Sequence, residues 1–188
     1  MKIGITGSIA CGKSAVISYL SDKGYKVYDA DKISYFLTQK PNLCYNRIVS
    51  EFGEEILDEN KEINRKKLGN IVFNNKDKKK LLESIIHPEV INEINKINDE
   101  ICFVEVPLLY EAKIEDLFDK IIVVASSKEK QIERLRMRNG LAIDEAINRI
   151  NNQMDINEKI KKADYVVYNN DLLDNLYKQI DNILKGIR

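Results

Sequence analysis

Short apolar runs alternate with segments in which apolar residues recur at helical spacing, and this alternation is typical of an α/β protein. Residues 3–6 (IGIT) form the first strand candidate. Residues 13–22 follow, with Val16, Ile17 and Leu20 on one helical face. The amino-terminal part of the chain therefore predicts a strand, a glycine-containing turn and a helix.

A second strand is predicted by YKVYDAD, which ends at Asp29 and Asp31. The next clear strand candidate, ICFVEV at residues 101–106, begins about 70 residues later. A structureless connection of that length is uncommon in a compact domain. The chain must therefore form other structure in this interval.

The pattern between these two strands is helical. DKISYFLTQ, CYNRIVSEFG, NRKKLGNIVF and KKKLLESIIHPEVINEINKI each carry apolar residues at helical spacing. Asn64 is a helix-cap candidate, and Pro88 is expected to open a new helix. We predict an inserted helical subdomain over about residues 34–100.

Strands and helices alternate again in the last part of the chain. Residues 120–126 (KIIVVAS) and 163–170 (ADYVVYNN) predict two further strands, and two helices separated at Asn139-Gly140 are expected between them. Residues 172–184 form the last helix candidate. Because helices separate the strands, we predict a parallel sheet with helices on both faces.

Composition narrows the functional classes. The 188 residues suit one α/β domain with insertions, and 30 basic against 30 acidic side chains argue against a sequence-indifferent nucleic-acid binder. Cys11, Cys44 and Cys102 lack metal-ligand spacing, which predicts a reducing compartment without disulfides. Apolar runs are too short to span a bilayer, and Gly7 and Gly12 interrupt any signal-peptide pattern. We expect a soluble cytoplasmic protein with no membrane or nucleic-acid partner, and a monomer is favoured.

Residues 7–14, GSIACGKS, match the P-loop pattern of glycine, four residues, glycine, lysine, and serine or threonine. Gly7 and Gly12 allow close approaches that a side chain forbids, so successive amide hydrogens can point inward towards phosphate. Lys13 is predicted to reach the β- and γ-phosphates of a nucleotide, and the Ser14 hydroxyl to ligate Mg²⁺. A chance glycine-rich turn is the alternative, which the position between a strand and a helix disfavours.

The carboxylates that end the second strand are candidates for acceptor chemistry, because open α/β sheets bind ligands at the carboxyl ends of their strands. We assign Asp31 as the group that orients an acceptor hydroxyl and takes its proton while a phosphoryl group moves in line. Asp29 would lie nearer the metal or the strand end. The alternative is a helix cap for KISYFL.

Four arginines follow the fourth strand: Arg134, Arg136, Arg138 and Arg149. Guanidinium groups stabilise a transferring phosphoryl group, and Gly140 offers a hinge, so we predict a lid over about residues 134–155. The alternative is a solvated face on which Glu129, Glu133 and Asp144 pair with the arginines. That alternative suits Arg136 better than Arg138.

The sequence leaves two interpretations open for the role of His87 and two for the role of Cys11. His87 is either a capping or packed residue or a contact for the acceptor. Cys11 lies in the loop, where a backbone contact to phosphate is favoured over a redox role. Neither Asn-Lys-x-Asp nor Asp-x-x-Gly occurs, so a GTPase is disfavoured and a small-molecule phosphotransferase is favoured.

These segments together resemble the dephospho-coenzyme A kinase family over nearly the whole chain. The resemblance rests on GITGSIACGKS, DAD at 29–31, NRKKLGNIVF at 64–73, LLESIIHPEV at 81–90, VPLLYEA at 106–112, QIERLRMR at 131–138, RINNQ at 149–153 and ADYVVYNN at 163–170. It implies a P-loop kinase-type three-layer α/β fold with a five-stranded parallel sheet, in a single domain 1–188 with a helical acceptor-binding insertion and a lid. It also implies ATP- and Mg²⁺-dependent phosphorylation of the ribose 3′-hydroxyl of dephospho-coenzyme A, the last step of coenzyme A biosynthesis.

The family pattern implies three groups of site residues. The ATP-binding group is Gly7, Ala10, Cys11, Gly12, Lys13, Ser14, Ala15, Arg149 and Asn169. The group near dephospho-coenzyme A is Asp31, Arg65, His87, Pro107, Leu108, Leu109 and Glu111. The catalytic group is Asp31 as the base, Lys13, and Arg138 in the lid.

The chain departs from the family pattern within the loop. Ser8 replaces a usual glycine, Cys11 a usual serine, and Ala15 a frequent threonine. Because both required glycines and the Ser14 hydroxyl remain, we expect the phosphate-binding loop to be kept. Glu105 either holds a magnesium-bound water or is a simple strand-end carboxylate.

Two other functions stay open from the sequence. One is a small P-loop kinase that acts on a nucleoside monophosphate or a sugar acid, and an acceptor assay separates it from the first hypothesis. The other is a nucleotide-binding switch without catalysis, which stoichiometric binding without turnover would favour.

Overall fold

A computed structural model of the protein describes residues 1–187. The chain divides into two compact units. One contains Met1–Tyr28 and the chain from Asp99 onward, and we call it the sheet unit. The other is Asp29–Asn98, which we call the helical unit.

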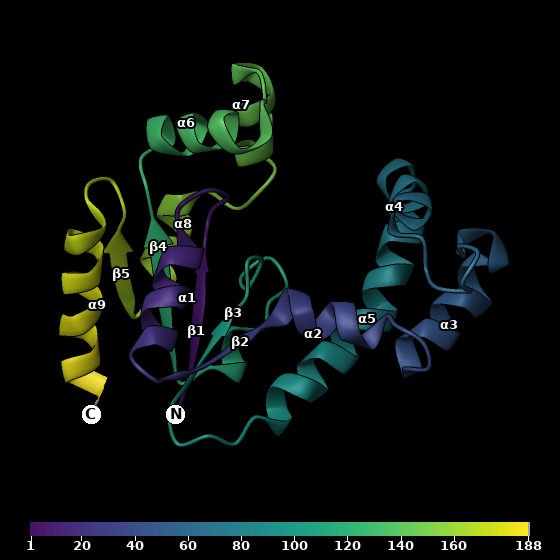
Figure 1. The fold of residues 1–188 in the computed structure, drawn as a ribbon, viewed down its shortest axis with the longest axis horizontal. Coiled ribbons are helices and arrows are strands. Elements are labelled where there is room, and N and C mark those ends of the chain that lie inside the picture. The colour runs from purple at the N-terminus through teal and green to yellow at the C-terminus, as the bar shows by residue number, and fades with distance from the viewer. Residues whose placement is uncertain (188) are drawn as a thin grey trace. The chain divides into compact units, whose positions relative to one another are not determined.

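The sheet unit is built on a five-stranded parallel sheet with the strand order β2-β3-β1-β4-β5 (Figure 1). The strands are β1 (Lys2–Gly7), β2 (Lys26–Asp29), β3 (Cys102–Glu105), β4 (Lys120–Ala125) and β5 (Tyr165–Tyr168). Ile3 of the central β1 is in register with Phe103 of β3 and with Lys120 of β4. The predicted five-stranded parallel sheet is confirmed.

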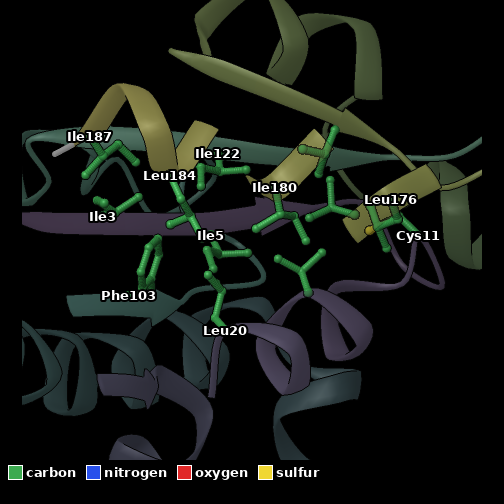
Figure 2. Packing of buried hydrophobic residues seen from close by; sticks show 13 residues of the cluster. Ile3, Ile5, Cys11, Leu20, Phe103, Ile122, Leu176, Ile180, Leu184 and Ile187 are labelled. Carbon is green, nitrogen blue, oxygen red and sulfur yellow. The ribbon is translucent and has the colours of Figure 1, made fainter. Parts of the chain in front are cut away.

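Helices α1 (Lys13–Asp22) and α9 (Leu173–Ile187) form the layer on one face of the sheet. Successive residues of a strand point to opposite faces, so Ile3 and Ile5 of β1 meet Leu20 of α1 and Ile180 of α9 in one buried cluster (Figure 2). Cys11, from the loop after β1, belongs to the same cluster. The hydrophobic core therefore extends to the base of that loop and anchors it.

On the other face of β1, Gly4 leaves room for neighbouring side chains that a Cβ would exclude. A Cβ at Gly4 would lie 2.8 Å from Leu109 Cδ1 and 3.1 Å from Phe118 Cγ, so Gly4 allows the segment after β3 to pack directly on the sheet. Thr6 Oγ1 donates to the carbonyl of Pro107 at 3.2 Å and fixes the start of that segment.

Three helices follow β4, where the sequence predicts two. α6 (Lys128–Asn139) and α7 (Ile143–Asn151) lie beyond the carboxyl ends of the strands, and Gly140 ends α6 in a left-handed conformation with φ of 65° (Figure 1). The predicted break at Asn139-Gly140 is confirmed. The third helix, α8 (Ile156–Lys162), packs against β4. Its apolar face is too short to give a helical pattern, and its stability comes from this packing and from the Asp155 cap.

The helical unit has a core of its own. It contains α2 (Ala30–Leu37), α3 (Leu43–Phe52), α4 (Arg65–Asn74) and α5 (Lys76–Lys96), around a cluster that includes Ile48, Phe52 and Ile85. The stretch is helical, as its pattern predicts. Asn64 caps α4, because its side chain accepts hydrogen bonds from the backbone N–H groups of Lys66 and Lys67, both at 3.1 Å.

The predicted helix start at Pro88 is wrong, because α5 runs through this residue. The helix instead begins after Asn75, whose side chain caps it. Proline removes one helical hydrogen bond, but Pro88 is exposed, so water can solvate the carbonyl group that loses its partner. The buried Ile85 and Ile94 on either side hold the helix together. Among residues 1–187, no helix combines the length and apolar character that crossing a membrane requires.

Candidate active site

The loop between β1 and α1 adopts a backbone that demands small residues. Gly7, Ala10 and Gly12 have positive φ angles of 154°, 58° and 97°. A Cβ at Gly7 would lie 2.2 Å from the carbonyl oxygen of Val124, and a Cβ at Gly12 would lie 1.9 Å from Asn169 Nδ2. Both glycines of the predicted motif are therefore needed for steric reasons as well as for conformational ones.

Side chains from outside the loop hold three consecutive loop carbonyl groups. Ile9 O accepts from Gln131 Nε2 at 2.6 Å, Ala10 O from Arg134 Nη1 at 3.2 Å, and Cys11 O from Asn169 Nδ2 at 3.0 Å. In a trans peptide the C=O group and the following N–H group point in opposite directions. The N–H groups of Ala10, Cys11 and Gly12, which follow these carbonyls, are therefore directed to the inner side of the loop, which is the arrangement that binds anions. Cys11 N–H donates to Ser8 O there, at 3.4 Å.

The amino terminus of α1 adds to this anion-binding character. Gly12 is its N-cap residue, has a left-handed conformation and supplies no capping side chain. Asp29, Asn64 and Asn75, by contrast, cap α2, α4 and α5 with their side chains. The first N–H groups of a helix have no intrahelical partner and carry its positive dipole end, so an incoming phosphate can take the place of the cap at α1.

Lys13 and Ser14 occupy the first turn of α1. Lys13 Nζ donates to Gly7 O at 3.3 Å and to Ser8 O at 3.2 Å, so the ammonium group is held over the loop by exchangeable contacts. Ser14 is exposed, and its hydroxyl is an oxygen ligand of the kind that Mg²⁺ prefers. In residues 1–187 no group of three or more His, Cys, Asp or Glu side chains is arranged to hold a metal ion.

Cys11 contributes its backbone and its bulk, and its thiol is buried. Burial raises the pKa of this thiol despite the lowering effect of the nearby Lys13 charge. The thiol is therefore protonated at neutral pH, where a reactive cysteine would be a thiolate. This favours the structural interpretation of Cys11 over the redox one.

The arginines after β4 separate into two kinds. Arg134 is bound in place, because its guanidinium group donates to Ala10 O, to Ser126 Oγ and, at 2.8 Å, to Asn169 O. Arg138, one turn further along α6, is exposed, and its Nε donates to Asn139 Oδ1 at 3.0 Å. Arg149 on α7 is exposed as well.

Glu111 belongs to an ion pair in which the lysine is buried and the glutamate is partly buried. Its Oε1 lies 2.8 Å from Nζ of the fully buried Lys159 and accepts from Met154 N at 3.0 Å. Burial opposes ionisation of Glu111, but the hydrogen bond and charge of Lys159 outweigh it, so the pKa of Glu111 lies below its ordinary value. The pair holds the segment after β3 against α8.

The predicted acceptor-binding residues of that segment differ in accessibility. Leu108 is 47% exposed, whereas Leu109 is fully buried against Gly4. The carbonyl of Pro107 accepts hydrogen bonds from Thr6 and, at 3.5 Å, from Lys159. Leu108 is therefore the side chain of this segment that a ligand can reach most directly.

The remaining predicted residues lie in the helical unit. Asp29 caps α2 by accepting from Asp31 N at 2.9 Å and Lys32 N at 3.1 Å, so the capping alternative applies to Asp29. Asp31 is exposed in the first turn of the same helix. Arg65 lies over the Tyr35 ring, 3.9 Å from its centroid, and His87 is exposed on α5.

Three side chains that shape the site were assigned no role from the sequence. Gln131 and Gln153 hydrogen-bond to the loop, and Lys159 neutralises Glu111. Gln131 does lie three residues before Arg134, and so on the same side of α6, which is the signal that could have drawn attention to it. Gln153 ends RINNQ, one of the segments that carry the family resemblance, whereas Lys159 lies outside all of those segments.

The dephospho-CoA kinase family model matches residues 1–175. The chain belongs to the dephospho-CoA kinase family. A Fusobacterium nucleatum dephospho-CoA kinase is 44% identical, with 100% of this chain and 98% of that protein covered. The solved structure of a Campylobacter jejuni dephospho-CoA kinase is 36% identical and has a TM-score of 0.74, with 100% of this chain and 98% of that chain covered.

More distant structures support the fold of this dephospho-CoA kinase family member. A shikimate kinase from Aquifex aeolicus has a TM-score of 0.55 at 18% identity, covering 100% of this chain and 98% of that chain. An identity this low bears on fold alone. The predicted P-loop kinase-type fold is confirmed.

Replacing Gly12 by alanine should damage nucleotide binding. The new Cβ would displace Asn169, 1.9 Å away, and release the carbonyl group of Cys11. We expect ATP affinity, measured by titration calorimetry, to fall about tenfold or more. Gly24→Ala is the matched control, because Gly24 also has a positive φ but a Cβ there would meet nothing within 4 Å. Wild-type ATP affinity in Gly12→Ala would contradict this account of the loop.

Replacing Glu111 by glutamine should destabilise the fold in a pH-dependent way. The folded-state pKa of Glu111 lies below its ordinary value of 4.5, so the pair's contribution is fully present above that pH and is lost as pH falls through the folded-state pKa. At neutral pH the variant leaves Lys159 buried without its partner, and we expect a loss of about 3 kcal/mol in urea unfolding.

The same loss should shrink on acidification, because protonated Glu111 resembles glutamine. Glu158→Gln is the control, since it breaks only the exposed pair with Lys161 and should change unfolding little. If the difference in unfolding free energy between wild type and Glu111→Gln stays constant down to acidic pH, the ion pair does not cause the difference.

Proposed function

We propose that the protein transfers the γ-phosphoryl group of ATP to the ribose 3′-hydroxyl of dephospho-coenzyme A, giving coenzyme A and ADP. The observation that carries the proposal is the loop from Gly7 to Ser14, whose carbonyl groups are held outward by Gln131, Arg134 and Asn169. Membership of the dephospho-CoA kinase family over residues 1–175 supports the choice of acceptor.

On the nucleotide side, the inward N–H groups of the loop and the first turn of α1 bind the β- and γ-phosphates. Lys13 exchanges its contacts with Gly7 O and Ser8 O for phosphate oxygens and balances the charge that develops on them. Ser14 Oγ would hold Mg²⁺, which would screen phosphate charge. Asn169 stabilises the loop through its hydrogen bond to the carbonyl group of Cys11.

On the acceptor side, Asp31 takes the proton of the 3′-hydroxyl. The hydroxyl oxygen forms a bond to the γ-phosphorus while the bond between that phosphorus and the ADP oxygen breaks. Asp29 already caps α2, so Asp31 is not needed for capping. Arg65 and His87 of the helical unit, with Leu108 of the sheet unit, are the proposed contacts to dephospho-coenzyme A. Glu111 acts indirectly, by holding the segment that carries Leu108.

The segment of about residues 134–155 is proposed as the lid. Arg134 is committed to loop carbonyls. Arg136, Arg138 and Arg149 are all exposed, and we assign the phosphate contacts to Arg138 and Arg149. Arg138 is proposed to stabilise charge on the transferring group when the lid closes.

A reducing, cytoplasmic location fits the three buried cysteines. Cys11, Cys44 and Cys102 are all unpaired, and burial raises the pKa of each thiol, which protects it from oxidation.

An acceptor screen tests the proposed function. The protein is incubated with ATP and Mg²⁺, and ADP release is followed with dephospho-coenzyme A, nucleoside monophosphates, sugar acids or no acceptor. We expect only dephospho-coenzyme A to stimulate ADP release, with coenzyme A identified by mass. Stimulation by another acceptor alone would refute the proposed substrate, and ATP binding without turnover on any acceptor would indicate a switch.

Replacing Asp31 by asparagine should reduce kcat about 10²- to 10⁴-fold, because asparagine cannot accept the acceptor's proton. ATP affinity should stay within about threefold of wild type, whereas Lys13→Ala should lower both kcat and ATP affinity. Asp29→Asn is the control, since asparagine caps helices as well as aspartate does. Undiminished kcat in Asp31→Asn would remove Asp31 from the role of base.

A further inference from the structure

The peptide groups on both sides of Ile9 are held by two glutamines. Ile9 N–H donates to Gln153 Oε1 at 2.7 Å, and Ile9 O accepts from Gln131 Nε2 at 2.6 Å. Gln131 is only 2% exposed. We call Gln131 and Gln153 the glutamine clamp.

The orientation of each clamp amide follows from its partner. A backbone N–H group can only donate and a carbonyl oxygen can only accept, so Gln153 must present its oxygen and Gln131 its nitrogen. Ser8 Oγ also donates to Gln153 Oε1, at 3.3 Å. The two glutamines therefore have opposite hydrogen-bonding roles, although their side chains are identical.

The clamp acts on the part of the loop that is least stable by itself. Ala10, the next residue, has φ of 58°, a left-handed conformation that is unfavourable for a residue with a side chain. A flip of the Ile9–Ala10 peptide would relieve the left-handed conformation of Ala10. Ile9 O would then point to the inner side of the loop and repel phosphate. The donor of Gln131 opposes that flip by holding Ile9 O outward.

The clamp also joins the loop to the segment proposed as the lid. Gln131 lies in the first half of α6, and Gln153 lies just after α7, so the two residues bracket the helices that carry Arg138 and Arg149. A displacement of α6 relative to the end of α7 would reach Ile9 through two hydrogen bonds.

We propose that the glutamine clamp is a positioning device that sets the two peptide groups of Ile9 for phosphate binding. The donor of Gln131 holds the Ile9–Ala10 peptide, and the acceptor of Gln153 holds the Ser8–Ile9 peptide. Neither glutamine is assigned a contact with substrate. The inference rests on the proposed function only in that the loop must bind a nucleotide.

One substitution made at both positions tests the proposal. Gln131→Glu removes the donor and places a carboxylate against Ile9 O, whereas Gln153→Glu keeps an acceptor for Ile9 N–H. Each variant adds one negative charge beside the loop, so the effect of charge is shared. At about pH 8 we expect Gln131→Glu to weaken ATP binding about 10- to 100-fold, and Gln153→Glu to weaken it several-fold less.

Acidification supplies a signature that a merely structural role would not give. A protonated carboxyl group can donate, so ATP affinity of Gln131→Glu should recover towards that of wild type as the pH falls to about 6. Gln131→Leu has no group to protonate and should show no such recovery. Wild type is titrated at each pH, which corrects for protonation of ATP itself.

The outcomes decide the proposal as follows. Equal losses in the two glutamate variants at every pH, or wild-type ATP affinity in Gln131→Glu, would overturn it. If Gln131→Glu does not fold, Gln153→Glu and Gln153→Leu replace it, and the proposal requires the glutamate variant to bind ATP more tightly. If wild-type protein binds ATP but fails to phosphorylate dephospho-coenzyme A, only the proposed function is refuted. If wild-type protein binds no ATP, the proposed function and the role of the glutamine clamp are both refuted.

Discussion

The orientation of three peptide groups gives the loop after β1 the form of an anion site. A planar peptide cannot turn its C=O outward without turning the next N–H inward, and the carbonyl groups of Ile9, Ala10 and Cys11 are all held outward. The donors are neutral amides and one guanidinium group, so they stabilise the carbonyls and add positive charge behind an anion site. Everything proposed for phosphate transfer depends on this arrangement.

The loop can hold this shape because its ends are fixed by packing. Cys11 is part of the core between the sheet, α1 and α9 (Figure 2). Gly7 and Gly12 lie against Val124 and Asn169 with no room for a Cβ. A tightly packed core transmits small displacements instead of absorbing them. The anion site is therefore a product of the fold's central strands as much as of its own glycines.

The two units divide the chemical tasks. The sheet unit carries the phosphate-binding loop, the proposed lid and the segment held by Glu111 and Lys159. The helical unit has a separate core and carries Asp31, which Asp29 places in the first turn of α2. Each unit has its own core, so each half of the proposed transfer reaction has a rigid support of its own.

Local sequence determined much of this protein. The strand-helix order, the glycine-lysine-serine motif and the Asn64 cap depend on neighbouring residues, so they could be predicted. Pro88 within α5 and the existence of α8 could not, because packing across the fold outweighs a weak local preference. The family resemblance placed Asn169 near the nucleotide, but only the tertiary structure decided how Asn169, Gln131 and Gln153 hold the loop. Their hydrogen-bond partners lie 158, 122 and 144 positions away along the chain, and local patterning does not record contacts that distant.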